Sequence, residues 1–246
     1  MSHNVLIVGA SSGIGAALAT TYAANGDRVA LVARREALLK DLAKNCEAAG
    51  AVQAHTYAHD VTDYDAVPGL FQRIVSDMGG LDAVIYCAGY LPKIEPDEYD
   101  FTKDRQVFEV GLLGAVAWLN QAAIKFMAQQ SGSICGISSI AGDRGRRAFP
   151  SYHSSKAGLD TYLESLRNRL HPFKVDVTTI KPGFIDTAMT KGMEGLFWVI
   201  SPEQAAITIK KHIDKRCHTR YVPARWGLVG RVIRNIPSFV FRRMDI

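Results

Sequence analysis

Cysteine is scarce in this chain of 246 residues, and its spacing is irregular. The four cysteines stand apart as Cys46, Cys87, Cys135 and Cys217. They show neither the paired spacing of a zinc site nor the framework of a small disulfide-rich domain. The sequence therefore predicts no metal site, and scattered thiols of this kind are typical of a reducing cytoplasm.

Long apolar runs, repeats and linkers are also missing. No apolar run approaches the roughly 18 residues that a membrane-spanning helix needs. The first four residues contain no Lys or Arg before the apolar run 5–8, so a signal peptide is not expected. Because 48% of the residues are apolar and no Gly/Ser-rich stretch divides the chain, we expect one well-buried core.

Negative charge is in deficit, since 29 Lys and Arg residues outnumber 24 Asp and Glu residues and leave a formal net charge of +5. This excess favours anionic partners, such as phosphates or an anionic membrane surface. Nucleic acid is not expected as a partner, because the basic residues are not interleaved with an aromatic-rich platform.

Short apolar segments alternate with amphipathic ones along the whole chain, and this alternation of strand and helix patterns is typical of a βαβ fold. We expect strands at 5–8, 28–33, 52–57, 81–86, 132–138 and 175–180. We expect helices at 14–24, 36–49, 64–78, 102–129 and 152–170. The sequence thus predicts an α/β fold with a single Rossmann-like, doubly wound parallel sheet and helices on both faces. This domain would cover 1–224, with a basic amphipathic extension at 225–246.

Glycines gather where the first predicted strand meets the first predicted helix. In this place glycine permits a tight turn and the close approach of a pyrophosphate to the backbone. The N-terminus of the helix adds free N–H groups and partial positive charge. The motif predicts a dinucleotide cofactor held by Gly9, Ser11, Ser12, Gly13, Ile14 and Gly15.

The end of the second predicted strand bears on the choice of cofactor. Ala33 stands where an acidic residue would bind a free ribose 2′-hydroxyl, and Arg34 and Arg35 follow it. Guanidinium groups make charge-assisted contacts to a 2′-phosphate, so the sequence favours NADP(H) over NAD(H), with Arg34 as the main contact. The alternative is that both arginines only begin a solvated helix. Contacts to adenine and ribose are expected from the loops at Asp60, Val61, Ala88 and Gly89.

A tyrosine and a lysine share one predicted helix, as Tyr152-His153-Ser154-Ser155-Lys156. Their i,i+4 spacing puts the phenol and the ammonium on one face, about a turn apart. Ser139 precedes them along the chain. The glycine motif, Asp60, Ala88-Gly89, Ser139, the Tyr/Lys pair and the segment 182–187 form an ordered set. This set resembles the short-chain dehydrogenase/reductase family over nearly the whole chain.

The resemblance implies an enzyme that transfers a hydride between a nicotinamide and a carbonyl or alcohol. Tyr152 would be the general acid, while Lys156 would lower the pKa of the phenol and hold the nicotinamide ribose. Ser139 would orient the substrate oxygen. The resemblance assigns the loop beneath the nicotinamide and the contacts to its carboxamide to Pro182, Gly183, Ile185 and Thr187. Members of the family usually assemble as homodimers or homotetramers.

One position departs from the pattern of the family. Gly111 stands in the predicted helix 102–129 where the family commonly has an asparagine that holds a water of the proton relay. A glycine there leaves room for an extra water, or it marks an enzyme with weak turnover. Cys87 likewise replaces an asparagine before Ala88, which is more often structural than catalytic.

Arginines follow Ser139 in an unusual cluster of Arg144, Arg146 and Arg147, which we call the arginine loop (144–147). Three guanidinium groups beside a substrate entrance favour an anionic group on the substrate, and we expect these residues to bind it. A solvated loop or a subunit contact explains the cluster equally well.

The C-terminal segment from residue 225, here called the tail, is basic and amphipathic. One helical face carries Trp226, Val229, Val232, Ile233, Ile236 and Val240, whereas Arg231 and Arg234 lie opposite. Such a segment could contact an anionic membrane at the periphery, cover a substrate groove, or dock on its own domain or on a second copy.

Three segments resemble one branch of the family, the decaprenylphosphoryl 2-keto-ribose reductases. They are the run 141–147, the Tyr/Lys pair with the following Ala157-Gly158-Leu159-Asp160, and the stretch from Tyr221-Val222-Pro223-Ala224 to Phe241-Arg242-Arg243. These reductases act on a keto-sugar carried by a polyprenyl phosphate. The leading hypothesis is therefore a cytoplasmic reductase of a lipid-linked carbonyl substrate, working at the inner face of the membrane. The alternatives are a general carbonyl reductase for small ketones and a low-turnover NADP(H)-binding scaffold.

Overall fold

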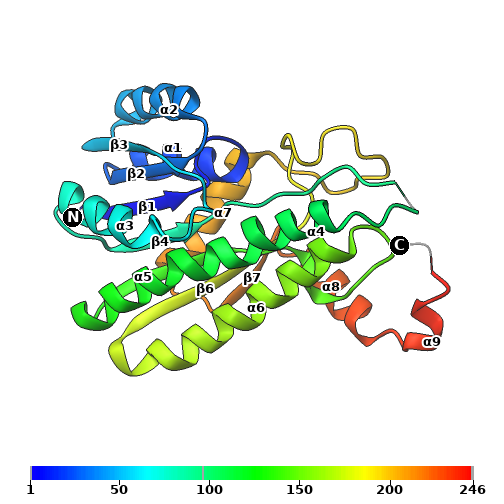
Figure 1. The fold of residues 1–246 in the computed structure, drawn as a ribbon. Helices are drawn as coiled ribbons and strands as arrows, with labels where there is room; N and C mark the ends of the chain where they lie inside the picture. The colour runs from blue at the N-terminus through cyan, green and yellow to red at the C-terminus, as the bar shows by residue number, and fades with distance from the viewer. Residues whose placement is uncertain (1, 96, 245–246) are drawn as a thin grey trace.

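The computed structural model describes residues 2–95 and 97–244, which form a parallel sheet between two layers of helices (Figure 1). Within these residues seven strands lie in the order β3-β2-β1-β4-β5-β6-β7, and every neighbouring pair is parallel. Their bounds are β1 Asn4–Val8, β2 Arg28–Ala33, β3 Gln53–Ala58, β4 Ala83–Tyr86, β5 Gly132–Ile137, β6 Val175–Pro182 and β7 Thr219–Val222. The winding reverses between β1 and β4, which confirms the doubly wound fold.

Helices bury both faces of this sheet. They are α1 Gly13–Ala24, α2 Glu36–Ala49, α3 Val67–Met78, α4 Phe101–Phe108, α5 Gly114–Gln129, α6 Pro150–Leu170, α7 Pro202–Asp214, α8 Trp226–Asn235 and α9 Ser238–Phe241. One core contains α1, α2 and α7, and the other contains α3, α5 and α6. Along β1, Val5 and Ile7 enter the first core, while Leu6 and Val8 enter the second. Burial on both faces explains the continuously apolar sequence of this strand.

The strand β7 and the helix α7 were missed by the sequence prediction. The edge strand β7 exposes Thr219 and Arg220, so it lacks the apolar run by which the other strands were found. The helix α7 does carry a local signal, because Ser201 and Gln204 form a capping box at its start.

The predicted helix 102–129 is interrupted by a π-helix, Glu109–Leu113, between α4 and α5. The buried Tyr86 hydroxyl donates a hydrogen bond of 2.6 Å to the Val110 carbonyl in this turn. By length and composition alone, Phe101–Gln129 could cross a membrane. Half of its most apolar 18-residue window is nevertheless buried inside the fold, as in a core helix.

The tail lies at the carboxyl edge of the sheet, at the lower right of Figure 1. Its helix α8 ends at Asn235, because Ile236 precedes a proline and is extended with ψ 127°. The predicted single apolar face is therefore divided. Trp226 is buried, but Val232 and Val240 are 55% and 40% exposed.

Candidate active site

The glycine motif links β1 to α1 in a tightly packed turn. Gly9 has φ +90°, and a Cβ placed on it would lie 2.5 Å from the Ala88 nitrogen. Gly13 also has positive φ, and a Cβ there would lie 3.1 Å from Cγ2 of Thr187. The structure thus brings Ala88 against the glycine motif, while the predicted contacts of Ala88 and Gly89 to the cofactor stay a prediction. No side chain caps the start of α1, so its N–H groups fit a pyrophosphate.

Two arginines flank this motif in different ways. Arg35 donates from Nη2 to the hydroxyls of Ser11 and Ser12, at 2.8 Å and 2.7 Å. Arg34 lies beside Asp60, with 3.6 Å between Nη1 and Oδ2. Arg35, and not Arg34, therefore contacts the glycine motif, although the sequence analysis favoured Arg34 as the main contact of the cofactor.

Asp60 follows β3 and is held in place before the buried Val61. Its Oδ1 accepts hydrogen bonds from the Thr62 nitrogen and hydroxyl at 3.0 Å and 2.9 Å. Burial raises the pKa of Asp60, but the hydrogen bonds from Thr62 and the charge of Arg34 outweigh it, so the net shift of the pKa is downward. Asp60 is thus a charged, oriented carboxylate at the edge of the cofactor site.

The three predicted catalytic residues come together where β5 ends and α6 begins. Ser139 accepts a hydrogen bond of 3.1 Å from the Ala141 nitrogen and so starts a short turn. Lys156 is only 4% exposed, and its Nζ donates to the Ile137 carbonyl at 3.0 Å. Its Nζ also lies 5.7 Å from the centroid of the Tyr152 ring. The hydroxyl, phenol and ammonium thus face one small volume beside Gly89.

Burial governs the proton affinities of this group. It lowers the pKa of Lys156 to about 8, against the opposing charge of Asp160. Burial raises the pKa of Tyr152, while a hydrogen bond with Ser139 and the charge of Arg146 oppose that rise. In the protein without cofactor, Arg146 is thus the cation that opposes the rise in the pKa of Tyr152. The lowering of this pKa by Lys156 together with a bound nicotinamide stays a prediction.

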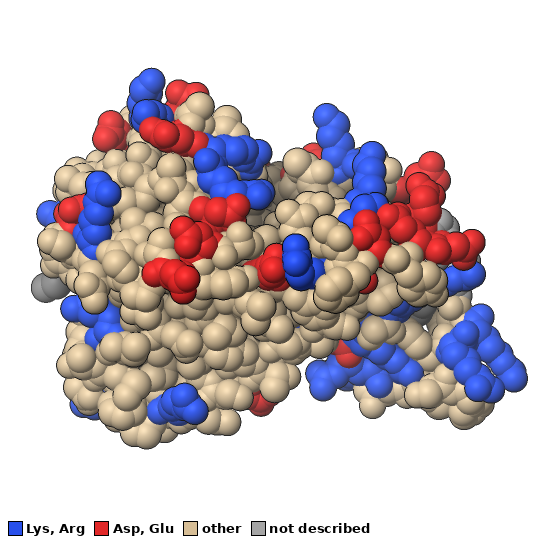
Figure 2. Space-filling model, in the orientation of Figure 1, with Lys and Arg blue, Asp and Glu red and all other residues tan. Residues whose placement is uncertain are grey.

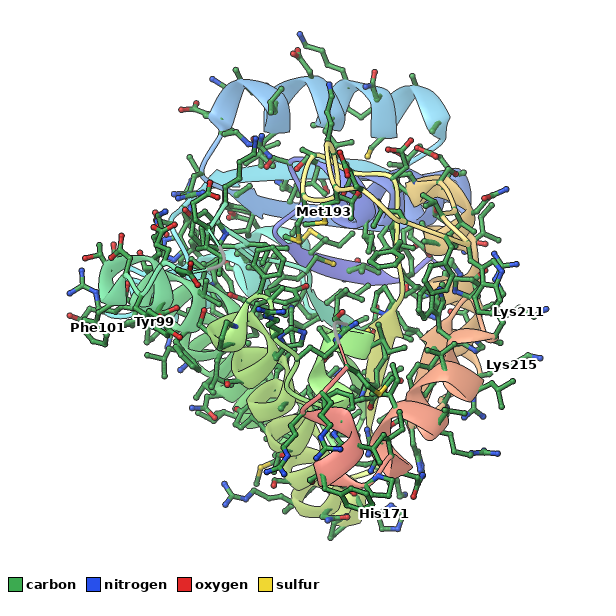
Figure 3. The ribbon with its side chains drawn as sticks, turned by 90° about the vertical axis from the view of Figure 1, so that its right-hand side faces the viewer. Tyr99, Phe101, His171, Met193, Lys211 and Lys215 are labelled. Carbon is green, nitrogen blue, oxygen red and sulfur yellow. The ribbon has the colours of Figure 1, made fainter. Side chains whose placement is uncertain are left out.

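The loop between β6 and α7 forms the floor and one wall of the site. The Gly183 nitrogen donates to the Val222 carbonyl at 3.0 Å, and the buried Ile185 pairs with Ile200. Sδ of Met189 lies 4.0 Å from the Tyr152 hydroxyl. Figure 3 faces the carboxyl edge of the sheet and shows this loop, with Met193 labelled, in front of the strands. Thr187 therefore lies beside Gly13 of the glycine motif. The contacts of Ile185 and Thr187 to a nicotinamide carboxamide stay a prediction.

Gly111 lies in the π-helix and faces the catalytic helix α6. A Cβ at this position would lie 3.2 Å from Oγ of Ser155, which itself donates to the Tyr152 carbonyl at 3.0 Å. An asparagine side chain here would have to displace Ser155. The departure at Gly111 is thus matched by a serine that occupies the adjacent space.

The arginine loop does not act as one cluster, because its side chains have different neighbours. Arg144 points to the tail and donates from Nη1 to the Ile233 carbonyl at 2.8 Å. Arg146 donates from Nε to Nε2 of His153 at 3.1 Å. Arg147 is exposed. Arg146 thus lies beside His153, the neighbour of Tyr152.

A buried ionic cluster behind the catalytic residues was missed by the sequence analysis. The ammonium of Lys181 lies 2.5 Å from Oδ1 of Asp143 and 2.8 Å from Oδ2 of Asp160. The Tyr221 hydroxyl donates to Oδ2 of Asp143 at 2.9 Å. One signal was available, since Asp160 follows Lys156 by four residues and so shares its helical face. The partners on β6 and in the turn after β5 are too distant in sequence to be predicted.

The first residue of α8 packs directly beneath the floor of the site. A Cβ on Gly183 would lie 2.0 Å from Nε1 of Trp226. The centroids of Phe184 and Phe197 lie 5.2 Å and 4.9 Å from that of Trp226. The tail thus supports the segment that would lie under a nicotinamide.

The cysteines are all free, with Cys46 and Cys135 buried. In residues 2–95 and 97–244 no group of three or more His, Cys, Asp or Glu side chains could hold a metal ion.

Comparison with known proteins assigns the family. Residues 3–195 match the family described as short chain dehydrogenase. An uncharacterized oxidoreductase of Mycobacterium tuberculosis is 32% identical over 242 residues, which cover 98% of this chain and 96% of that protein. The 11-beta-hydroxysteroid dehydrogenase 1A of Arabidopsis thaliana is 33% identical over 190 residues, or 76% of this chain and 54% of that protein. The chain belongs to the short-chain dehydrogenase/reductase family.

Solved structures share the same fold. A short-chain type dehydrogenase/reductase from Mycobacterium ulcerans aligns with a TM-score of 0.81 and 22% identity, over 99% of this chain and 100% of its own. An NAD⁺-bound xylitol dehydrogenase aligns with a TM-score of 0.79 and 21% identity, over 87% and 94%. Family and fold together define an NAD(P)(H)-dependent oxidoreductase, as the sequence analysis predicted.

Proposed function

We propose that the protein is an NADP(H)-dependent reductase that converts a carbonyl to an alcohol on a substrate bearing an anionic group. The observation that carries the proposal is the meeting of Ser139, Tyr152 and Lys156 beside the glycine motif. At neutral pH Tyr152 carries a proton that it could donate, because burial raises the pKa of its phenol.

The residues of this site have separate tasks in the proposed reaction. A bound nicotinamide would supply the hydride. Ser139 would donate a hydrogen bond to the substrate oxygen, and Tyr152 would transfer its proton to that oxygen as negative charge develops. Lys156 would hold the nicotinamide ribose, with Pro182, Gly183, Ile185 and Thr187 around the nicotinamide. Ala141 fixes the orientation of Ser139 through its backbone hydrogen bond.

The preference for NADP(H) is supported by the guanidinium of Arg35, which lies on the serine hydroxyls of the glycine motif. A ribose 2′-phosphate in this place would gain charge-assisted hydrogen bonds from Arg35 and the nearby Arg34. Ala33 offers no carboxylate to repel it.

The test of the catalytic assignment is the variant Tyr152→Phe, with Tyr99→Phe as its control because Tyr99 is 94% exposed. The phenylalanine fills the same space but has no proton to donate. We expect single-turnover reduction of a ketone to be lost in Tyr152→Phe and kept in Tyr99→Phe, while both variants bind NADPH. Reduction at a near-normal rate by Tyr152→Phe would refute the role of its phenol.

For the substrate, we propose a keto-sugar carried on a polyprenyl phosphate, since the arginine loop borders the site through Arg146. The alternative is a small neutral ketone, which needs no cation. Steady-state kinetics with a phosphate-bearing and a neutral ketone of equal length separates the two. A clear advantage in kcat/KM for the anionic ketone supports the first, and equal values favour the second.

We further propose that the protein works in the cytoplasm as a homo-oligomer in reversible contact with an anionic membrane. Leu228 and Phe239 of the tail are 66% and 62% exposed beside basic residues, as in a weak interfacial contact. Light scattering would test the oligomer, and flotation on anionic vesicles at low and high salt would test the membrane contact. The absence of flotation at low salt would refute the latter.

A further inference from the structure

Basic side chains gather around the tail, where Figure 2 shows blue groups at the lower right over α8 and α9. The arginine loop and the end of the tail enclose a cleft of about 550 Å³. Its lining consists of Gly145, Arg146, Arg147, Phe241, Arg242, Arg243 and Met244. Among the described residues this lining contains four guanidinium groups and no carboxylate.

Arg144 does not line the cleft but fastens one of its walls. Its Nη1 donates to the carbonyls of Ile233 and Ile236, and its Nη2 donates to Ser238 at 3.4 Å. Its guanidinium carbon lies 3.9 Å from the centroid of the Phe241 ring. These contacts place the end of the tail beside the arginine loop, so Arg144 is a positioning residue for the cleft.

Arg146 connects the cleft to the catalytic residues. It donates to His153, the neighbour of Tyr152, and its charge lowers the pKa of that tyrosine. On the opposite wall, the side chains of Arg242 and Arg243 make no hydrogen bond or ion pair with another described residue. A ligand in the cleft would therefore meet two unpaired guanidinium groups on one side and a group adjoining the active site on the other.

The chemistry of this lining fits a phosphate ester better than a carboxylate. The planar fork of a guanidinium matches two oxygens of a phosphate, and several forks can share its oxygens. A carboxylate offers only two oxygens, which one or two arginines would satisfy. Phe241 and Met244 add an apolar surface for the other substituent of the ester.

We propose that this cleft binds the phosphate of a phosphate ester with an apolar substituent, and that Arg242 and Arg243 of the tail complete the site. The tail is then part of the substrate site. The claim that the ester is the substrate rests on the proposed carbonyl reduction, whereas phosphate binding itself does not.

Decyl phosphate binding to the full chain, measured by calorimetry, tests the site. We expect the double variant Arg242→Gln, Arg243→Gln to weaken binding at least tenfold. The matched control is Arg231→Gln with Arg234→Gln. It removes the same charge from the tail, but these two arginines lie in α8 and line a different cleft. We expect less than a threefold change in this control. Equal losses in the two double variants would overturn the proposal, because general electrostatic attraction would then explain the binding.

The variant Arg144→Met tests the assembly of the cleft. It keeps every guanidinium of the lining but removes the contacts to the tail. We expect decyl phosphate to bind at least fivefold more weakly, while NADPH affinity and the unfolding midpoint stay near those of the parent. Unchanged decyl phosphate binding would refute the positioning role of Arg144.

Two further probes distinguish the sources of phosphate. Inorganic phosphate should bind at least tenfold more weakly than decyl phosphate, because it lacks the apolar substituent. Both double variants should bind vesicles of phosphatidylglycerol in phosphatidylcholine more weakly than the parent protein does, and to the same extent. If Arg242→Gln with Arg243→Gln impaired only vesicle binding, the site would belong to the membrane surface and the proposal would fail.

Kinetics separates this proposal from the proposed function. With a keto-alkyl phosphate, Arg242→Gln with Arg243→Gln should raise KM at least tenfold, and with a neutral ketone KM should not change. If the parent protein reduced no ketone but bound decyl phosphate with the expected pattern, the carbonyl reduction would fail and the phosphate site would stand. Equal effects on both ketones would remove the tail from the substrate site.

Discussion

The ammonium of Lys181 lies 2.8 Å from Oδ2 of Asp160, where 7% and 19% of the two side chains are exposed. Lys181 precedes the Pro182-Gly183 floor, and Asp160 lies one turn beyond Lys156 on α6. The pair thus joins the floor of the cofactor site to the catalytic helix. Asp143 extends the contact to the turn that contains Ser139.

We predict that Lys181→Met destabilises the fold by about 3 to 5 kcal/mol, because two buried carboxylates lose their cation. The free energy of unfolding in urea measures this change. Lys40→Met is the control, since the pair of Lys40 with Glu36 is exposed and its loss should be within error. Equal stability of the two variants would show that the Lys181 cluster contributes little.

We predict that NADPH binds at least tenfold more tightly than NADH, about 1.4 kcal/mol or more. Arg35→Ala should remove most of this preference and leave NADH affinity nearly unchanged, because Arg35 contacts both serines of the glycine motif. Arg34→Ala should have a smaller effect, since Arg34 pairs with Asp60. Titration of both cofactors decides the matter, and equal affinities in the parent protein would refute the phosphate contact.

We predict that acid destabilises the protein partly through His153. Burial and the charge of Arg146 lower the pKa of His153 to about 4, from an ordinary value of 6.5. Between these values the unfolded chain binds the proton more strongly, so the free energy of unfolding falls as pH falls from 6.5 to 4. The contribution reaches about 3 kcal/mol at most.

His153→Gln keeps an acceptor for Arg146 but cannot be protonated. Its free energy of unfolding should therefore fall less steeply between pH 6.5 and 4 than that of the parent protein. Identical slopes in urea titrations across this range would mean that other groups cause the acid sensitivity.

We predict that kcat/KM for NADPH falls as pH rises through about 8, because Lys156, which would hold the nicotinamide ribose, then loses its charge in the protein without cofactor. Tyr152, whose pKa is raised, stays protonated over this range. In Lys156→Arg the guanidinium keeps its charge over this range. The pH at which kcat/KM decreases should therefore be higher in this variant, even if its maximal value is lower. A profile that keeps its midpoint in this variant would assign the fall to another group.

The fold and the shared helical face of Tyr152 and Lys156 were predictable, because they depend on local patterns, whereas Ser139 was placed by the resemblance to the family. Apolar runs marked six of the strands, and the spacing of Tyr152 and Lys156 placed both on one helical face. The contact of Arg35 with Ser11 was not predictable, since neighbouring arginines differ only in the direction of their side chains. The site of Arg144 also required the structure, because its partner Ile233 lies 89 residues away.

The contact of Gly183 with Trp226 restricts how the chain can be altered. Even a single methyl group at position 183 would collide with the indole, which lies 2.0 Å from the place of that carbon. If the tail were exchanged for one that begins with another residue, a cavity would remain beneath residue 183. If residue 183 were made larger, its side chain would displace Trp226 and the tail with it. A functional chimera with a relative must therefore carry both positions from the same parent.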